Sequence, residues 1–103
     1  MNVVVTPTAQ AQIDHQLQYG IEHHGRHAAE RTFTRIMKFI TVSLASNPGG
    51  GTKIPDSDLY EWAIWRTPFI VIYRIEAETE TIRIVGFFHH AQDRSDADLT
   101  GDS

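Results

Sequence analysis

The chain has 103 residues, no cysteine and a formal net charge of −4. This length predicts one domain with a single hydrophobic core, and the absence of cysteine excludes disulfides and thiolate metal sites. The negative charge argues against nucleic-acid binding by bulk electrostatics, and no segment is apolar enough for a membrane span or a secretory signal. We therefore expect a cytoplasmic protein without a membrane partner.

The start of the chain is typical of a strand followed by a helix. Residues 2–5 are mostly apolar and form a candidate strand. Thr6 suits the N-cap of a helix, and Pro7 suits its first helical position. Apolar residues then recur at every fourth position over residues 9–21, which predicts a narrow apolar stripe on a helix. Gly25 should end this helix.

A second helix with a broader apolar face is predicted over residues 29–44, where apolar side chains follow the three-and-four spacing of a buried helix face. Asn47 and Pro48 prevent its continuation. Because the connection between the two helices is short, we expect an antiparallel helical hairpin. Residues 47–58 form a glycine-rich loop that lacks the ending of a phosphate-binding P-loop, so we interpret it as a helix-to-strand connection.

Three strands are predicted in the second half of the chain. Residues 60–66 show the period-two alternation of side chains that is typical of a strand with both faces partly covered. Residues 69–75 are almost all apolar and form the second strand, and residues 81–89 form the third. The apolar run predicts a central strand that is buried on both faces. Strict alternation along the third strand assigns Ile82, Ile84, Gly86 and Phe88 to the face that packs on the helices, and Arg83, Val85, Phe87 and His89 to the opposite face.

These elements predict an α+β fold in the order β-α-α-β-β-β, with an antiparallel sheet packed on an N-terminal helical hairpin. The helices should cover one face of the sheet, and the other face should be available for a partner. Residues 1–94 are predicted to form this single domain. Residues 95–103 are acidic and small, and we expect them to form a flexible tail.

The order and spacing of five segments are similar to those of the RelE/ParE family of bacterial type II toxins. These segments are VTPTAQAQI, HAAERTFTRI, NPGGG, WRTPFIVIYRI and IRIVGFFHHAQDR, and the likeness covers residues 3–94. The last segment most resembles the ParE branch. The resemblance implies a small toxin that a cognate antitoxin wraps and blocks, as a homodimer or in a toxin–antitoxin hetero-oligomer. It also implies one of two activities, which are inhibition of DNA gyrase in the ParE branch and cleavage of ribosome-bound mRNA in the RelE branch.

For RelE-like cleavage, the resemblance implies His89 as general acid or base and Arg66 and Arg74 as stabilisers of the phosphate charge, without a metal or another cofactor. The chain departs from the nucleases of the family, because residues 69–71 and Gly86 stand where basic residues are common. We therefore favour a ParE-like inhibitor of DNA gyrase that has no bond-breaking chemistry of its own. The alternatives are the ribosome-dependent endoribonuclease and an attenuated, non-toxic module that only binds an antitoxin.

For the ParE-like function, we expect the exposed side of the sheet and the end of its last strand to contact gyrase. Arg83, His89 and Arg94 are the candidate residues for this contact. Trp62 and Trp65 should point in opposite directions, and we expect Trp65 to be the exposed residue, covered by the antitoxin in the complex.

Two polar clusters on the predicted helices have ordinary interpretations. The histidines within residues 23–27 are interpreted as a solvated turn between the helices and not as metal ligands. Arg31, Arg35 and Lys38 form a basic stripe on the second helix, which is typical of a solvated face. The alternative for this stripe is an acidic segment of a partner that lies along it.

Overall fold

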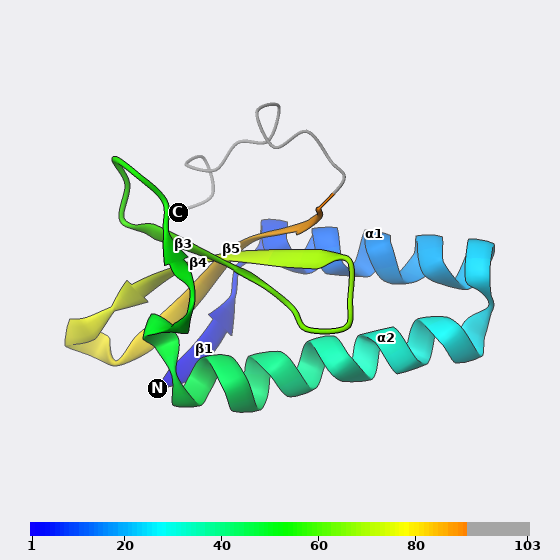
Figure 1. Ribbon diagram of the computed structural model, residues 1–103, viewed down its shortest axis with the longest axis horizontal. Coiled ribbons are helices and arrows are strands. Elements are labelled where there is room, and N and C mark those ends of the chain that lie inside the picture. Colours follow the sequence, from blue (N-terminus) through cyan, green and yellow to red (C-terminus); the bar gives the residue numbers. More distant parts are fainter. Residues whose placement is uncertain (91–103) are drawn as a thin grey trace.

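The computed structural model describes residues 1–90, which form two α-helices and a five-stranded sheet (Figure 1). Arg94 and the predicted tail at residues 95–103 lie outside the described residues. The two helices and the sheet confirm the predicted α+β class, and the sheet has one short strand more than predicted, Thr52–Lys53. The strands are β1 (Asn2–Val5), β2 (Thr52–Lys53), β3 (Leu59–Ala63), β4 (Phe69–Glu76) and β5 (Thr81–His89), and the helices are α1 (Pro7–His24) and α2 (Arg26–Lys38).

The strands lie in the order β1-β5-β4-β3-β2. Neighbours from β2 to β5 pair antiparallel, as expected for strands joined by short connections. β1 instead pairs parallel to β5, with Val3 opposite Ile82, so the sheet is mixed and not wholly antiparallel. The parallel pair is possible because α1 and α2 follow β1 in the sequence and precede the other strands. The helical hairpin thus provides the long connection that parallel pairing requires.

The predicted helical hairpin is confirmed, and specific residues fix its ends. The side-chain hydroxyl of Thr6 accepts a hydrogen bond from Ala9 N (3.3 Å), which caps α1, and donates one to Ile84 O (2.9 Å). Gly25 is the single residue between α1 and α2, and its φ of 85° is a conformation that glycine adopts readily. α2 continues into a π-helix, Phe39–Leu44, so the helical segment extends as far as predicted.

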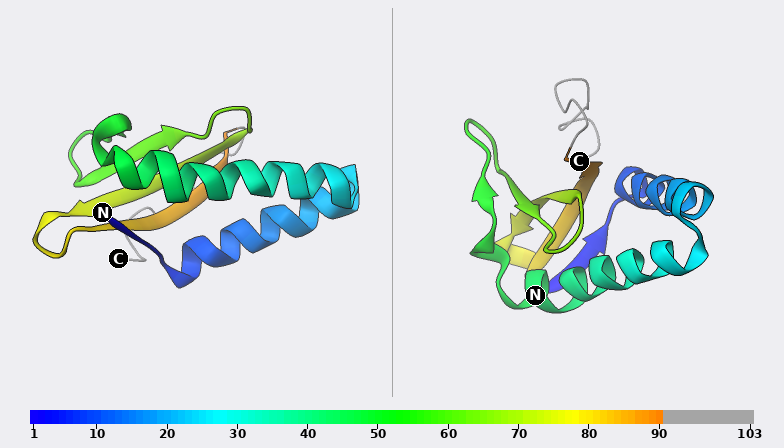
Figure 2. Two further views of the ribbon diagram at one scale, coloured as in Figure 1. Left: turned by 90° about the horizontal axis from the view of Figure 1, so that it is seen from below. Right: turned by 45° about the vertical axis from the view of Figure 1, so that its right-hand side comes forward.

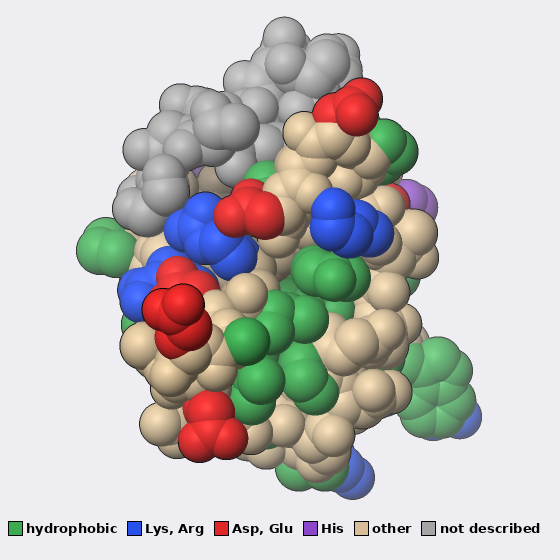
Figure 3. All heavy atoms as spheres, turned by 90° about the vertical axis from the view of Figure 1, so that its left-hand side faces the viewer, with side chains coloured by type: hydrophobic (Ala, Val, Ile, Leu, Met, Phe, Trp, Pro, Cys, Tyr) green, Lys and Arg blue, Asp and Glu red, His purple; other side chains and the backbone are tan. Residues whose placement is uncertain are grey.

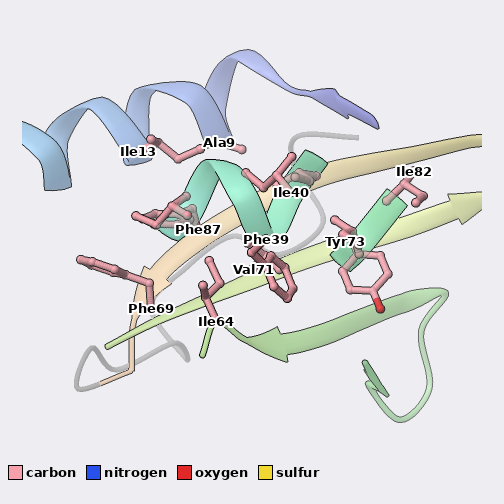
Figure 4. Close-up of a cluster of buried hydrophobic side chains, with 13 residues drawn as sticks. Ala9, Ile13, Phe39, Ile40, Ile64, Phe69, Val71, Tyr73, Ile82 and Phe87 are labelled. Atoms are coloured by element: carbon pink, nitrogen blue, oxygen red, sulfur yellow. The ribbon is translucent and has the colours of Figure 1, made fainter. Parts of the chain in front are cut away.

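Both helices lie on one face of the sheet, and their connected ends extend beyond it (Figures 1 and 2). Apolar side chains of the helices meet those of β3, β4 and β5 in the main hydrophobic core (Figure 4). Val71 and Tyr73 are fully buried on this side of β4, and Ile72 is fully buried on the other side, which confirms the predicted central strand. No described helix has the combination of length and hydropathy that a membrane span needs.

β5 contains a β-bulge that changes the facing of its side chains. Ile72 pairs with Gly86, but the next residue of β4, Tyr73, pairs with Ile84, so Val85 is an extra residue in β5. An extra residue interrupts the strict alternation of side chains along a strand. The predicted facing is therefore correct before the bulge and wrong after it.

The bulge reverses the predicted orientation of the end of β5. Phe87 belongs to the main core and stacks on Phe69, whereas Phe88 packs in a separate cluster on the opposite face. His89 also faces the helical hairpin, and not away from it as predicted. Gln12 of α1 holds this part of β5, because its Oε1 accepts a hydrogen bond of 2.8 Å from Phe87 N.

The opposite face of the sheet, called here the helix-free face, is covered by neither α-helix (Figure 2). Its centre is a smaller apolar cluster of Leu59, Ile72, Val85 and Phe88, and all four side chains are buried. This burial reduces the part of the face that was expected to be available for a partner.

Candidate functional site

His89 lines a cavity of about 170 Å³ between the helical hairpin and the end of the sheet. Its ring packs edge-on against Phe69, with the ring centroids 5.6 Å apart. Most of the remaining wall consists of apolar side chains from α1 and α2, and Tyr19 and His24 are among its polar members. The arrangement is suited to an apolar side chain of a partner that makes polar contacts at the edge of the cavity.

Arg74 and Arg83 are paired with carboxylates on the helix-free face. They lie directly opposite each other on β4 and β5, and both contact Glu76. Arg83 donates two hydrogen bonds to this carboxylate, from Nε at 2.8 Å and from Nη2 at 3.1 Å. Arg74 Nε lies 3.5 Å from Glu76 Oε2, and Arg74 Nη1 lies 3.7 Å from Asp58 Oδ2. Figure 3 shows basic and acidic side chains beside one another at the end of the molecule that carries the β4–β5 hairpin.

This pairing shifts the ionisation of the cluster. Hydrogen bonds from Arg83, aided by the charges of both arginines, lower the pKa of Glu76 below its ordinary value of 4.5. The same hydrogen bonds raise the pKa of Arg83. A phosphate that approached either arginine would have to compete with the carboxylate that already accepts from it.

Glu76→Gln is expected to weaken the dependence of stability on acidic pH. Because the folded-state pKa of Glu76 is lowered, its contribution is fully present above the unfolded-state pKa and is lost as the pH falls through the folded value. The measurement is the urea midpoint of unfolding at about pH 6 and at about pH 3. Glu78→Gln is the control, because this exposed carboxylate of the same hairpin has no ion pair within residues 1–90. Equal pH dependence in the two variants would contradict the expectation.

Trp65 and Arg66 lie in the turn between β3 and β4, and not in a strand that reaches residue 66 as predicted. β3 ends at Ala63, and Arg66 has a φ of 61°, which a strand does not allow. Trp65 is 77% exposed, so the prediction that it is the exposed tryptophan is confirmed. The guanidinium carbon of Arg66 lies 4.5 Å from the centre of its ring. Trp62 packs instead against Phe39 in the core.

The structure does not bring the predicted catalytic residues together. Arg66 lies in the turn at the end of the sheet that carries His89, whereas Arg74 lies toward the other end of β4 and is bound to acidic side chains. The residues predicted to contact gyrase are also separated. Arg83 and His89 lie toward opposite ends of β5 and on opposite faces, and Arg94 lies outside the described residues.

The phenol of Tyr73 is a buried polar group with a structural role. Its oxygen donates a hydrogen bond to Pro48 O (2.7 Å) and accepts one from Gly51 N (3.1 Å). Burial raises the pKa of this phenol, so it stays neutral and can donate. These bonds attach the glycine-rich loop to β4, which agrees with the interpretation of the loop as a connection.

The cavity beside His89 was not anticipated from the sequence. Tyr19, which lines it, stacks on His23 of α1 with the ring centroids 3.9 Å apart, and their spacing of four residues is a local signal near the cavity. The cavity itself depends on the packing of α1 and α2 against the end of the sheet, which no local pattern encodes. Within residues 1–90, no three His, Asp or Glu side chains are placed to hold a metal ion.

The chain is similar to known proteins both in sequence and in fold. A family model described as the ParE toxin of the type II toxin–antitoxin system parDE matches residues 3–94. The fold is similar to a structure of a chromosomal ParDE system from P. aeruginosa, with a TM-score of 0.70, 19% identity and coverage of 86% of this chain and 95% of that one. It is also similar to the RelBE2 toxin–antitoxin complex of Mycobacterium tuberculosis, with a TM-score of 0.63, 20% identity and coverage of 85% and 95%. No curated protein sequence matches the chain significantly.

Proposed function

This chain belongs to the family of ParE toxins of type II toxin–antitoxin systems, and on that premise we propose that it inhibits DNA gyrase and is neutralised by a cognate antitoxin. Its action is protein recognition in the cytoplasm, without bond-breaking chemistry of its own. The solved relatives come from both a ParDE and a RelBE system, so the choice between gyrase and mRNA depends on the site and not on the fold.

The observation that favours gyrase inhibition is the engagement of the arginines of the sheet. RNA cleavage through the 2′-hydroxyl needs cationic groups at the phosphate and an acid or base beside them. Arg74 and Arg83 instead share the carboxylate of Glu76, on the face opposite to His89.

The antitoxin is proposed to cover the cavity between the helical hairpin and the sheet. This cavity offers an apolar wall that includes Ile13, Leu17 and Phe33, and it opens beside the end of β5. An extended or helical segment that inserts an apolar side chain there would also cover His89. Neutralisation then results from occupancy of the toxin surface.

Expression of the chain without an antitoxin is expected to arrest bacterial growth, with gyrase-dependent DNA breaks and intact transcripts. The purified chain is expected to inhibit supercoiling by gyrase in vitro. His89→Ala is the discriminating variant, because it removes the candidate acid or base of the nuclease alternative. Transcripts are expected to be intact with both the parent chain and this variant.

Two results would contradict this proposal. Transcripts that are cut by the parent chain and left whole by His89→Ala would identify the ribosome-dependent endoribonuclease. Unhindered growth, with a chain that is folded and binds its antitoxin, would identify a non-toxic antitoxin-binding module.

A further inference from the structure

α2 presents a row of exposed cationic side chains. Arg31, Arg35 and Lys38 are spaced by four and three residues, so they lie along one side of the helix, and all three are exposed. None of them forms an ion pair with a carboxylate of residues 1–90. Arg26 differs, because it faces Glu30 at 3.9 Å. In a chain with a net charge of −4, this row is a local concentration of positive charge.

The turn between β3 and β4 places an exposed indole beside this row. The turn lies over α2 (Figures 1 and 2), and Arg35 Nη1 lies 3.5 Å from Arg66 O. Trp65 is the most exposed of the large apolar side chains in residues 1–90, and Arg66 stacks on it. Thr67 N donates to Ile64 O (3.1 Å), which closes the turn. The backbone that carries the indole therefore belongs to a defined turn.

A solvated face explains the cations of α2 but does not explain the exposed tryptophan. Trp and Arg are among the residue types that are enriched at the energetically dominant positions of protein interfaces. The positive charge selects an acidic partner and guides its approach. Single-stranded nucleic acid usually requires several aromatic platforms in series, and here Trp65 is a single platform in an acidic chain. The combination thus favours a protein.

We propose that Trp65, Arg66, Arg35 and Arg31 form a docking surface for an acidic protein segment. The carboxylates of the segment pair with the arginines, and an apolar or aromatic side chain of the segment packs on the indole. The contacts that define this surface, between Arg35 and Arg66 and between Arg66 and Trp65, do not depend on which molecule the toxin inhibits. The proposal therefore holds whether gyrase or the ribosome is the target.

The test is a fluorescence titration of the full-length chain with a synthetic glutamate-rich peptide that contains one phenylalanine. The tryptophan emission is expected to shift and saturate, because Trp65 is exposed and Trp62 is packed in the core. The shift should disappear in Trp65→Phe. The double variant with Arg31→Glu and Arg35→Glu should bind at least ~tenfold more weakly, since like charges then face the peptide. Arg26→Glu is the matched control, with one charge reversed on the same helix outside the row.

Three outcomes would overturn the proposal. The first is an emission that the peptide leaves unchanged. The second is equal weakening by the double variant and by two control reversals, Arg26→Glu with Lys53→Glu, which would indicate an effect of net charge alone. The third is tighter binding of a single-stranded oligothymidine than of the peptide. None of these measurements uses growth arrest, so failure here is distinguishable from failure of the proposed gyrase inhibition.

Discussion

Phe87→Ala is expected to lower the free energy of unfolding by about 3–5 kcal/mol. Phe87 is 1% exposed, stacks on Phe69 with ring centroids 5.0 Å apart and belongs to the main core beneath the helices. Its removal leaves a cavity where β5 meets α1, and the total stability of such a domain is only about 5–15 kcal/mol. Urea denaturation followed by circular dichroism measures the loss.

Phe88→Ala is the matched control, because it makes the same change at the next residue. Phe88 is 5% exposed, but it belongs to the smaller cluster on the helix-free face. We expect a smaller loss of stability than for Phe87→Ala, since fewer buried side chains surround the cavity. The opposite order of the two losses would indicate a strand without the bulge, in which Phe88 faces the helices.

The elements themselves could be predicted because their signals are local. The three-and-four spacing of apolar residues indicated the second helix, and the apolar run at residues 69–75 indicated the central strand. Thr6 and Gly25 marked the start of α1 and its end, because their cap and backbone preferences act within one turn. Each of these features depends on few neighbours, and each is found in the structure.

The facing of the last strand could not be obtained from alternation alone. One extra residue at the bulge exchanges the faces of all later side chains, including Phe87, Phe88 and His89. Gly86 was the available signal, because a glycine inside a strand often marks a bulge. Strict alternation instead treats Gly86 as an ordinary residue of the helix-facing side. It therefore predicts His89 on the wrong side of the sheet, whereas Arg83, which precedes the bulge, is predicted on the correct side.

The pairing of the arginines with Glu76 depends on the register of β4 and β5, which cannot be predicted from a local sequence pattern. Arg74 and Arg83 stand opposite each other only because β4 and β5 pair in the observed register, and Glu76 then reaches both. From the sequence, each arginine is a separate candidate for contact with a phosphate or a protein. In the structure both arginines form ion pairs with Glu76, and the pKa of this glutamate is lowered. The exposed Trp65 was correctly anticipated, but its place in a turn beside Arg35 was not.

Gly50→Ala is expected to destabilise the protein by about 1–3 kcal/mol, because there is no space for the added methyl group. A Cβ on Gly50 would overlap the six-membered ring of Trp62, with distances of 2.7 Å to Cζ3 and 2.8 Å to Cζ2. The ring cannot easily withdraw, since it packs edge-on against Phe39 at a centroid distance of 4.9 Å. The glycine therefore serves close packing of the loop on β3, and not the approach of a phosphate. Thermal and urea unfolding measure the effect.

Gly49→Ala is the control, because no atom lies within 4 Å of a Cβ at that position and its backbone is not left-handed. It is expected to be neutral or to stabilise the protein by up to about 1 kcal/mol, since alanine restricts the unfolded chain more than glycine does. Gly51→Ala should resemble Gly50→Ala, because a Cβ there would lie 2.8 Å from Glu61 O. Equal stability of all three variants would contradict the packing argument and would reopen the question of why three glycines follow Pro48.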